Sequence, residues 1–118
     1  MIIDFRDNSI TYVTEAIHLK KHAPLSTSFS KIEVLKDGRL LIMEDYYQYQ
    51  FEDKSNLYCL DRELEIEWFV PIPTTYDLKD VYAGFTSNGD RVFANTYTGF
   101  RVEINISDGS IRGTEFVK

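Results

Sequence analysis

The residues of this chain that could do chemistry are a histidine pair, two pairs of adjacent acids and one cysteine. His18 and His22 are four residues apart, which on a helix would place both imidazoles on one face, where they could bind zinc. The metalloprotease pattern needs a glutamate after the first histidine, but Leu19 stands there and no third ligand is nearby. The segment therefore indicates an ordinary polar loop, and we expect no metal or other cofactor.

The acid pairs at 44–45 and 52–53 could act as general acid and base only if their surroundings separated their pKa values. The sequence contains no Gly-rich phosphate loop and no nucleophile elbow. Cys59 lies in the apolar strand pattern 57–60, where a cysteine is usually a small core residue. A lone cysteine also excludes an internal disulfide. We expect a protein that is not an enzyme.

Negative charge is concentrated in one segment of the chain, whose 118 residues carry a net charge of −6. Residues 44–67 contain eight acids and two bases, while the remaining residues carry 11 acids and 11 bases. This distribution argues against nucleic-acid binding, which needs a basic surface. The acids form either a solvated face that aids solubility or a docking surface for a basic protein partner.

The most suggestive group of side chains is aromatic and lies in the same segment. Alternation along a strand would place Tyr47, Tyr49 and Phe51 on one face, and these residues are core aromatics if that face points inward. The alternative is an inserted hairpin tip that forms an interface, because tyrosine offers a large rigid contact area. The predicted partner-binding residues are Glu44, Asp45, Tyr46, Tyr47, Tyr49, Glu52, Asp53, Glu63, Glu65 and Glu67.

These residues must be positioned by strands, because apolar and polar side chains alternate along most of the chain. Asp37-Gly38 and Asn88-Gly89 between alternating runs are strong hairpin signals. The pattern predicts a loop over 18–29 and an all-β fold of ten strands without a long helix. The expected strand pairs are 2–6 with 9–17, 31–35 with 39–44, 57–61 with 64–70, 81–86 with 91–96, and 100–106 with 110–117.

One short pattern occurs three times, at residues 3–12, 60–68 and 104–113. Each copy reads as a strand, a turn and a returning strand, and regular repetition of this kind is typical of folds built from similar sheets. Aligning the copies predicts two four-stranded antiparallel meanders, at 31–70 and 81–117. An N-terminal hairpin at 1–17 matches the second half of such a unit, and all three parts form one domain over 1–118.

The aligned residues resemble blades of the PQQ-like (quinoprotein-type) β-propeller repeat, and the chain also resembles small bacterial proteins that carry one such signature. The signature is an aliphatic residue, an Asp, a turn commonly carrying Gly, an aliphatic residue and a Trp, and Leu60-Asp61, Ile66 and Trp68 fit it. The third copy has Gly113 where the Trp would stand. In the family the Trp packs between neighbouring blades, so the resemblance implies a core position for Trp68.

The chain is too short to close a propeller, which takes four or more blades. The resemblance therefore implies the sheet architecture and not the dehydrogenase activity of the large quinoprotein enzymes. We expect two sheets packed face to face, with the first hairpin completing or covering an edge. Because an exposed sheet edge can pair with another strand, a homodimer formed through an edge or a face is a further expected arrangement.

The favoured function is a non-enzymatic module whose acidic and aromatic surface binds a basic protein partner. An immunity protein that blocks a nuclease-type toxin by presenting carboxylates in place of phosphates would fit this description. One alternative is a small-molecule binder or weak enzyme with a pocket between the sheets, lined by Tyr58, Trp68 and Tyr82. Another is a structural, dimerising unit. The sequence shows no signal peptide or membrane-spanning run, so we expect a cytoplasmic protein without membrane partners.

Overall fold

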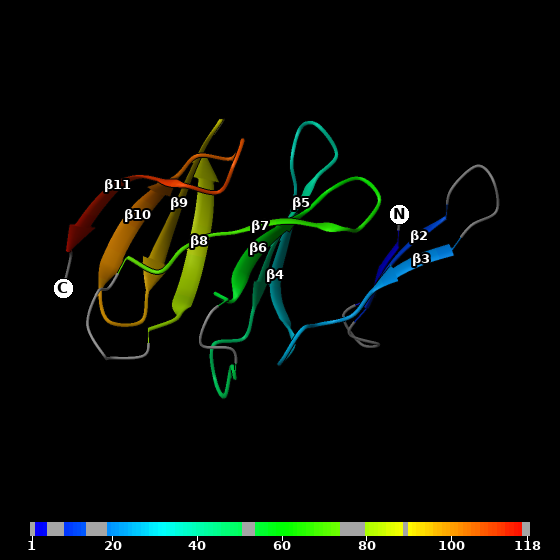
Figure 1. Cartoon of the computed structure of the whole chain (residues 1–118), viewed down its shortest axis with the longest axis horizontal. Helices are drawn as coiled ribbons and strands as arrows, with labels where there is room; N and C mark the ends of the chain where they lie inside the picture. The colour runs from blue at the N-terminus through cyan, green and yellow to red at the C-terminus, as the bar shows by residue number, and fades with distance from the viewer. Residues whose placement is uncertain are drawn as a thin grey trace.

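The described part of the chain consists of β-strands and connections, without a helix. This computed structural model describes residues 2–4, 9–13, 19–50, 54–73, 80–88 and 90–116. Its strands form three antiparallel sheets, none of which closes into a barrel (Figure 1). The all-β prediction is confirmed.

The strands follow chain order within each sheet. The N-terminal sheet contains β1 (Ile2–Asp4), β2 (Ser9–Val13) and β3 (Leu19–His22). The central sheet contains β4 (Phe29–Val34), β5 (Leu40–Glu44), β6 (Leu57–Leu60) and β7 (Ile66–Phe69). The C-terminal sheet contains β8 (Tyr82–Asn88), β9 (Arg91–Thr96), β10 (Phe100–Ile104) and β11 (Ile111–Phe116). The two predicted four-stranded meanders are therefore confirmed.

The N-terminal sheet has a third strand where the sequence pattern predicts a loop. β3 pairs with β2, with His22 opposite Ile10. β3 leads on to the first strand of the central sheet, as β7 leads on to the C-terminal sheet, so β1, β2 and β3 correspond to β5, β6 and β7. In this topology β1–β2 corresponds to β5–β6, whereas the sequence pattern aligns residues 3–12 with the β6–β7 hairpin. A strand–turn–strand pattern of ten residues cannot distinguish one hairpin of a meander from the next.

The three sheets stand side by side along the long axis of the molecule, which measures 47 × 30 × 21 Å (Figure 1). The central sheet is covered on both faces. One face carries Leu41, Met43 and Leu57 against the C-terminal sheet. The other carries Leu40, Ile42 and Tyr58 against Ile10 of the N-terminal sheet. Face-to-face packing is confirmed, but the N-terminal strands cover a face of the central sheet and not an edge.

Burial on both faces explains the sequence of β5, in which Leu40 to Met43 are consecutive apolar residues. A strand covered on one face alternates, whereas a strand covered on both faces is apolar throughout. All five residues of β5 are buried. This strand is the centre of the stack.

The β6–β7 and β10–β11 turns share the same construction. Asp61 Oδ1 accepts a hydrogen bond from the Glu63 backbone N–H at 2.8 Å, and Asn105 Oδ1 accepts one from the Ser107 N–H at 3.1 Å. The Gly109 turn also supports the contact between the sheets, because a Cβ at this position would collide with the Trp68 indole. Trp68 is partly buried and packs against the core between the central and C-terminal sheets, so it lies at the margin of that core and not inside it as predicted.

Consecutive connections lie at opposite ends of the strands, because neighbouring strands run in opposite directions. We call one end the turn edge; it carries turns 35–39, 61–65 and 105–110 together with Ser87 and Asp90. We call the other end the loop edge; it carries residues 45–50 and the turn 97–99. These two edges position the candidate functional residues.

Candidate functional site

The predicted partner-binding residues do not form one surface. Asp45, Tyr46 and Tyr47 lie at the loop edge, whereas Glu63 and Glu65 lie at the turn edge. The four residues of β6 separate the two groups, which corresponds to about 13 Å at the usual rise along a strand. Two further predicted residues, Glu52 and Asp53, lie outside the described residues.

Glu44, predicted as part of the surface, is completely buried. Its Oε1 accepts hydrogen bonds from the backbone N–H groups of Ser26 at 2.9 Å and Thr27 at 3.1 Å. Its Oε2 accepts hydrogen bonds from the Leu25 N–H at 2.7 Å and the Tyr58 hydroxyl at 2.5 Å. The surface position predicted for Glu44 is therefore wrong, because four donors that converge from other segments satisfy the carboxylate inside the protein.

His22 extends this buried network, since its Nε2 lies 2.8 Å from the Tyr58 hydroxyl. Burial lowers the pKa of His22, and the nearby Glu44 carboxylate only partly opposes this shift. Burial, followed by the charge of Glu44, raises the pKa of the Tyr58 hydroxyl. His18, the other member of the predicted histidine pair, lies outside the described residues. Within those residues no group of three His, Cys, Asp or Glu side chains is arranged to hold a metal ion.

The tyrosines of the 45–50 loop divide between the core and the surface. Tyr49 is buried and its hydroxyl donates to the Ser55 carbonyl at 2.9 Å, so it is a core aromatic. Tyr46 and Tyr47 are exposed. The Tyr46 ring lies 5.4 Å from that of Tyr97, in the turn that joins β9 to β10. The core interpretation therefore holds for Tyr49 and not for Tyr47, and the interface interpretation of the exposed tyrosines stays a prediction. Phe51 lies outside the described residues.

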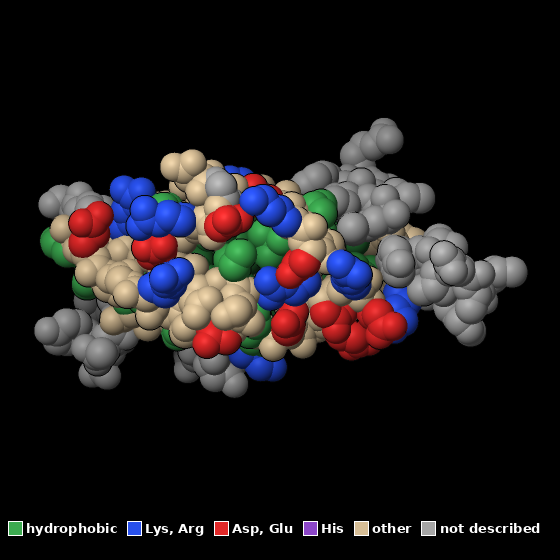
Figure 2. Space-filling view, turned by 90° about the horizontal axis from the view of Figure 1, so that it is seen from above, with side chains coloured by type: hydrophobic (Ala, Val, Ile, Leu, Met, Phe, Trp, Pro, Cys, Tyr) green, Lys and Arg blue, Asp and Glu red, His purple; other side chains and the backbone are tan. Residues whose placement is uncertain are grey.

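The β6–β7 turn carries the acids that remain available at the surface. The side chains of Glu63 and Glu65 are 69% and 71% exposed, and both lie near the Lys20 ammonium, at 3.7 and 3.9 Å. Glu67 on β7 lies 3.7 Å from Arg39. Figure 2 shows a contiguous group of acidic side chains at this end of the central sheet. Two exposed carboxylates thus share one partly buried ammonium.

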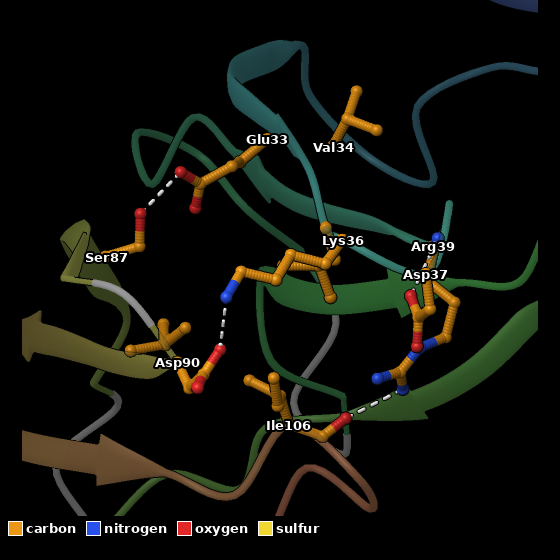
Figure 3. Close-up of a pocket in the computed structure, with 10 residues that line it drawn as sticks. Glu33, Val34, Lys36, Asp37, Arg39, Ser87, Asp90 and Ile106 are labelled. Carbon is orange, nitrogen blue, oxygen red and sulfur yellow. Dashed lines mark hydrogen bonds and ion pairs between the residues drawn. The ribbon is translucent and has the colours of Figure 1, made fainter.

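A cleft of about 170 Å³ opens beside this turn, between the central and C-terminal sheets (Figure 3). Leu35, Val92 and Ile106 line it with apolar surface. Three polar contacts cross it: the Lys36 ammonium donates to Asp90 at 2.8 Å, the Arg39 guanidinium donates to the Ile106 carbonyl at 2.7 Å, and the Ser87 hydroxyl donates to Glu33 at 2.5 Å. The cleft therefore has an apolar floor and a charged rim, which Figure 2 shows from above.

The carboxylates at the rim are held in their charged form. The hydrogen bond from Lys36 lowers the pKa of Asp90, and the backbone N–H of Arg39 lowers the pKa of Asp37. Asp37 and Arg39 also line a shallow hollow with Asp61, Arg62 and Glu63. The cleft and the acidic turn are therefore adjacent parts of one surface at the turn edge.

The cleft was not among the sites predicted from the sequence. Its residues come from turns that the repeat alignment matches, around Asp37-Gly38 and Asn88-Gly89. Matching turns of stacked sheets must lie side by side, so this alignment was the signal that could have located the cleft. The charges on these turns are individually ordinary, and their arrangement appears only in the structure.

The pocket predicted between Tyr58, Trp68 and Tyr82 is wrong as a single site. Tyr58 belongs to the core on one face of the central sheet, whereas Tyr82 and Trp68 belong to the core on the other face. Cys59 is buried and burial raises the pKa of its thiol to about 12, so at neutral pH it is a core residue and not a thiolate.

Comparisons of the chain with protein-family models, with curated proteins and with solved structures find no match in any of the three. Within the described residues there is no helix of the length and apolar character needed to cross a membrane. The turn edge, with its cleft and its exposed acids, is therefore the candidate functional site.

Proposed function

We propose that this chain is a protein-binding module that holds a basic segment of another protein at its turn edge and acts without catalysis. The observation that carries the proposal is the pair of exposed carboxylates of Glu63 and Glu65, with only Lys20 as a common cation among the described residues. An exposed excess of one charge attracts partners of the opposite charge and accelerates their association.

The neighbouring cleft supports this proposal because a stable interface needs apolar contact as well as charge. Leu35, Val92 and Ile106 provide that surface within the same edge. Interfaces commonly combine an apolar centre with a polar rim, and the turn edge has this arrangement. The Tyr46 and Tyr47 side chains, at the opposite edge, are not part of this binding surface.

An affinity experiment tests the proposed function. The full chain is immobilised and exposed to extract from its source cells, and bound proteins are identified by mass spectrometry. We expect a basic partner whose retention falls as the salt concentration rises, since salt screens exposed charges. Reversal of charge in Glu63→Lys should reduce retention by at least about tenfold, because a like charge then faces the partner.

Glu115→Lys is the matched control. It makes the same change in net charge at an exposed position of β11, in the C-terminal sheet. Equal loss in both variants would mean that only net charge matters, and undiminished retention in Glu63→Lys would contradict the proposal. Retention lost only in Glu63→Lys supports a localised site.

The proposal includes the narrower role of an immunity protein that neutralises a nuclease-type toxin. Clustered carboxylates can occupy the cationic groups that such a toxin uses to hold phosphates. In that case the captured partner is a nuclease, and its activity on DNA or RNA is inhibited by the wild-type chain but much less by Glu63→Lys. A captured partner without nuclease activity would leave the general proposal intact and exclude this role.

A further inference from the structure

The cleft between the central and C-terminal sheets contains a carboxylate that is only half satisfied. Glu33 projects from β4, and its Oε1 accepts a hydrogen bond from the Ser87 hydroxyl of β8 at 2.5 Å (Figure 3). Its Oε2 is buried and has no hydrogen-bond partner among the described residues. A buried carboxylate oxygen without a donor is unfavourable, so this atom is an acceptor ready for a ligand.

The cations around the cleft are already engaged elsewhere. Lys36 donates to Asp90 at 2.8 Å, and Arg39 donates to the Asp37 carboxylate and to the Ile106 carbonyl, each at 2.7 Å. Neither of them reaches Glu33 Oε2. None of the described residues therefore supplies this donor, which leaves the position open to a group from another molecule.

The size of the cleft indicates what kind of group enters. Its volume of about 170 Å³ is below the 300–1,000 Å³ that is usual for small-molecule pockets. It suits one side chain better than a whole cofactor or metabolite. Since Leu35, Val92 and Ile106 form its floor, the side chain should carry a hydrocarbon stem that ends in a cationic donor.

The single free oxygen distinguishes between the two basic side chains. A guanidinium binds a carboxylate best with two parallel hydrogen bonds, which require both oxygens. Ser87 occupies one oxygen of Glu33, so only a point contact remains. A lysine ammonium on its flexible four-carbon stem makes such a contact.

We propose that the cleft receives a lysine side chain of the basic partner, whose ammonium donates to Glu33 Oε2 while its methylene groups cover the apolar floor. This inference rests on the proposed function and specifies its anchor. Glu63 and Glu65 then attract the surrounding basic segment, and Glu33 fixes one lysine of that segment in place.

The test uses the capped tripeptide acetyl-Gly-Lys-Gly-amide and its arginine and norleucine counterparts, titrated into the full chain. Amide chemical shifts of Glu33, Ser87 and Val92 report binding. We expect saturable shifts with the lysine peptide, weaker binding of the arginine peptide and none of the norleucine peptide. Glu33→Gln should weaken lysine binding about tenfold or more, because a charged hydrogen bond is lost while the side-chain shape is kept.

A second variant tests the preference for lysine independently. Ser87→Ala leaves both oxygens of Glu33 free at an exposed position of β8, so arginine should gain affinity relative to lysine. An unchanged ratio of the two affinities contradicts the proposed geometry. So do the absence of saturable shifts, equal binding of norleucine, and undiminished binding to a folded Glu33→Gln variant.

The outcomes separate this inference from the proposed function. Retention of the partner that depends on Glu63 but not on Glu33 would overturn the lysine anchor and leave the binding function standing. Binding of the lysine peptide that is lost in Glu33→Gln, with partner retention indifferent to Glu63→Lys, would support the anchor and contradict the acidic docking surface.

Discussion

The central and C-terminal sheets have the same four-strand meander but opposite relations to solvent. Leu40 pairs with Leu60 in the central sheet, as Val92 pairs with Ile104 in the C-terminal sheet, so equivalent positions can be assigned. On the face of the central sheet that is turned away from the N-terminal sheet, the residues at these positions are apolar: Leu41, Met43, Leu57, Cys59 and Trp68. Their C-terminal equivalents are Phe93, Asn95, Arg101, Glu103 and Gly113.

This difference shows what ends the stack. On the outer face of the C-terminal sheet the Arg101 guanidinium covers the Phe93 ring at 4.7 Å, and Arg91 forms an ion pair with Glu103 at 2.9 Å. Terminal units of repeat folds need such a polar outer face to remain soluble. The same four-stranded meander can thus lie inside the stack or at its end, depending on whether a few side chains on one face are apolar or polar.

Exchanging an equivalent pair of residues should produce the largest effect. Leu57→Arg introduces, between two packed sheets, the arginine that stands at the equivalent position 101 of the C-terminal sheet. Because Leu57 is buried, this substitution buries an unpaired charge. We expect a loss in the free energy of unfolding above about 4 kcal/mol, measured by urea denaturation followed by circular dichroism. The reciprocal Arg101→Leu should change stability little, and similar losses in both variants would contradict the assignment of inner and outer faces.

Gly109, which contacts Trp68, and Gly113, which occupies the position equivalent to Trp68 in the C-terminal sheet, should respond differently to substitution by alanine. Gly109 has φ +80° and a Cβ there would collide with Trp68, so Gly109→Ala should cost about 3 kcal/mol. At Gly113 nothing lies within 4 Å of an added Cβ, and Gly113→Ala should be neutral or stabilise by up to about 1 kcal/mol. Thermal unfolding of the two variants provides the comparison, and equal melting temperatures would be inconsistent with the Trp68 contact.

Glu44 and its equivalent Thr96 are both buried, but Glu44 holds a neighbouring segment in place. Glu44→Gln removes the charge that four donors share, and we expect a loss of about 2 kcal/mol in the free energy of unfolding. Hydrogen exchange should show the main loss of protection at Leu25, Ser26 and Thr27. If these amides stayed protected and those of the C-terminal sheet became labile, the role assigned to Glu44 would be wrong.

The smallest expected effect is a pH dependence of the free energy of unfolding, which arises from His22 between the N-terminal and central sheets. Burial lowers the pKa of His22 below its ordinary value of 6.5, so below pH 6.5 the unfolded chain binds more protons than the folded one. The contribution of His22 is therefore complete above pH 6.5 and is lost as the pH falls toward the native pKa. His22→Gln should flatten the stability profile in that interval relative to wild type, and an unchanged slope would contradict this prediction.

Most of the fold could be predicted from the sequence because alternation and turn residues are local. The hairpins of both four-stranded sheets follow from alternating side chains around turns such as Asp37-Gly38. β3 could not be predicted in this way because it has four residues, of which Lys20 and Lys21 are charged. Its pairing depends on contacts with β2 and not on its own pattern.

The candidate site could be predicted only where exposure follows from the local sequence. Glu63 and Glu65 belong to a polar turn and are exposed as expected. Glu44 resembles them in the sequence, but its burial depends on backbone N–H groups of residues 25–27 that lie far away along the chain. Glu33 carries no signal at all, since a single glutamate in an alternating strand indicates a solvent-facing position.

The only tryptophan of the chain lies at the boundary between the central and C-terminal sheets. Its fluorescence will therefore respond when these two sheets separate, while detachment of the N-terminal strands alone will leave the emission almost unchanged. A far-ultraviolet signal registers both events. Any interval between the two optical transitions during denaturation then measures how independently the N-terminal layer opens.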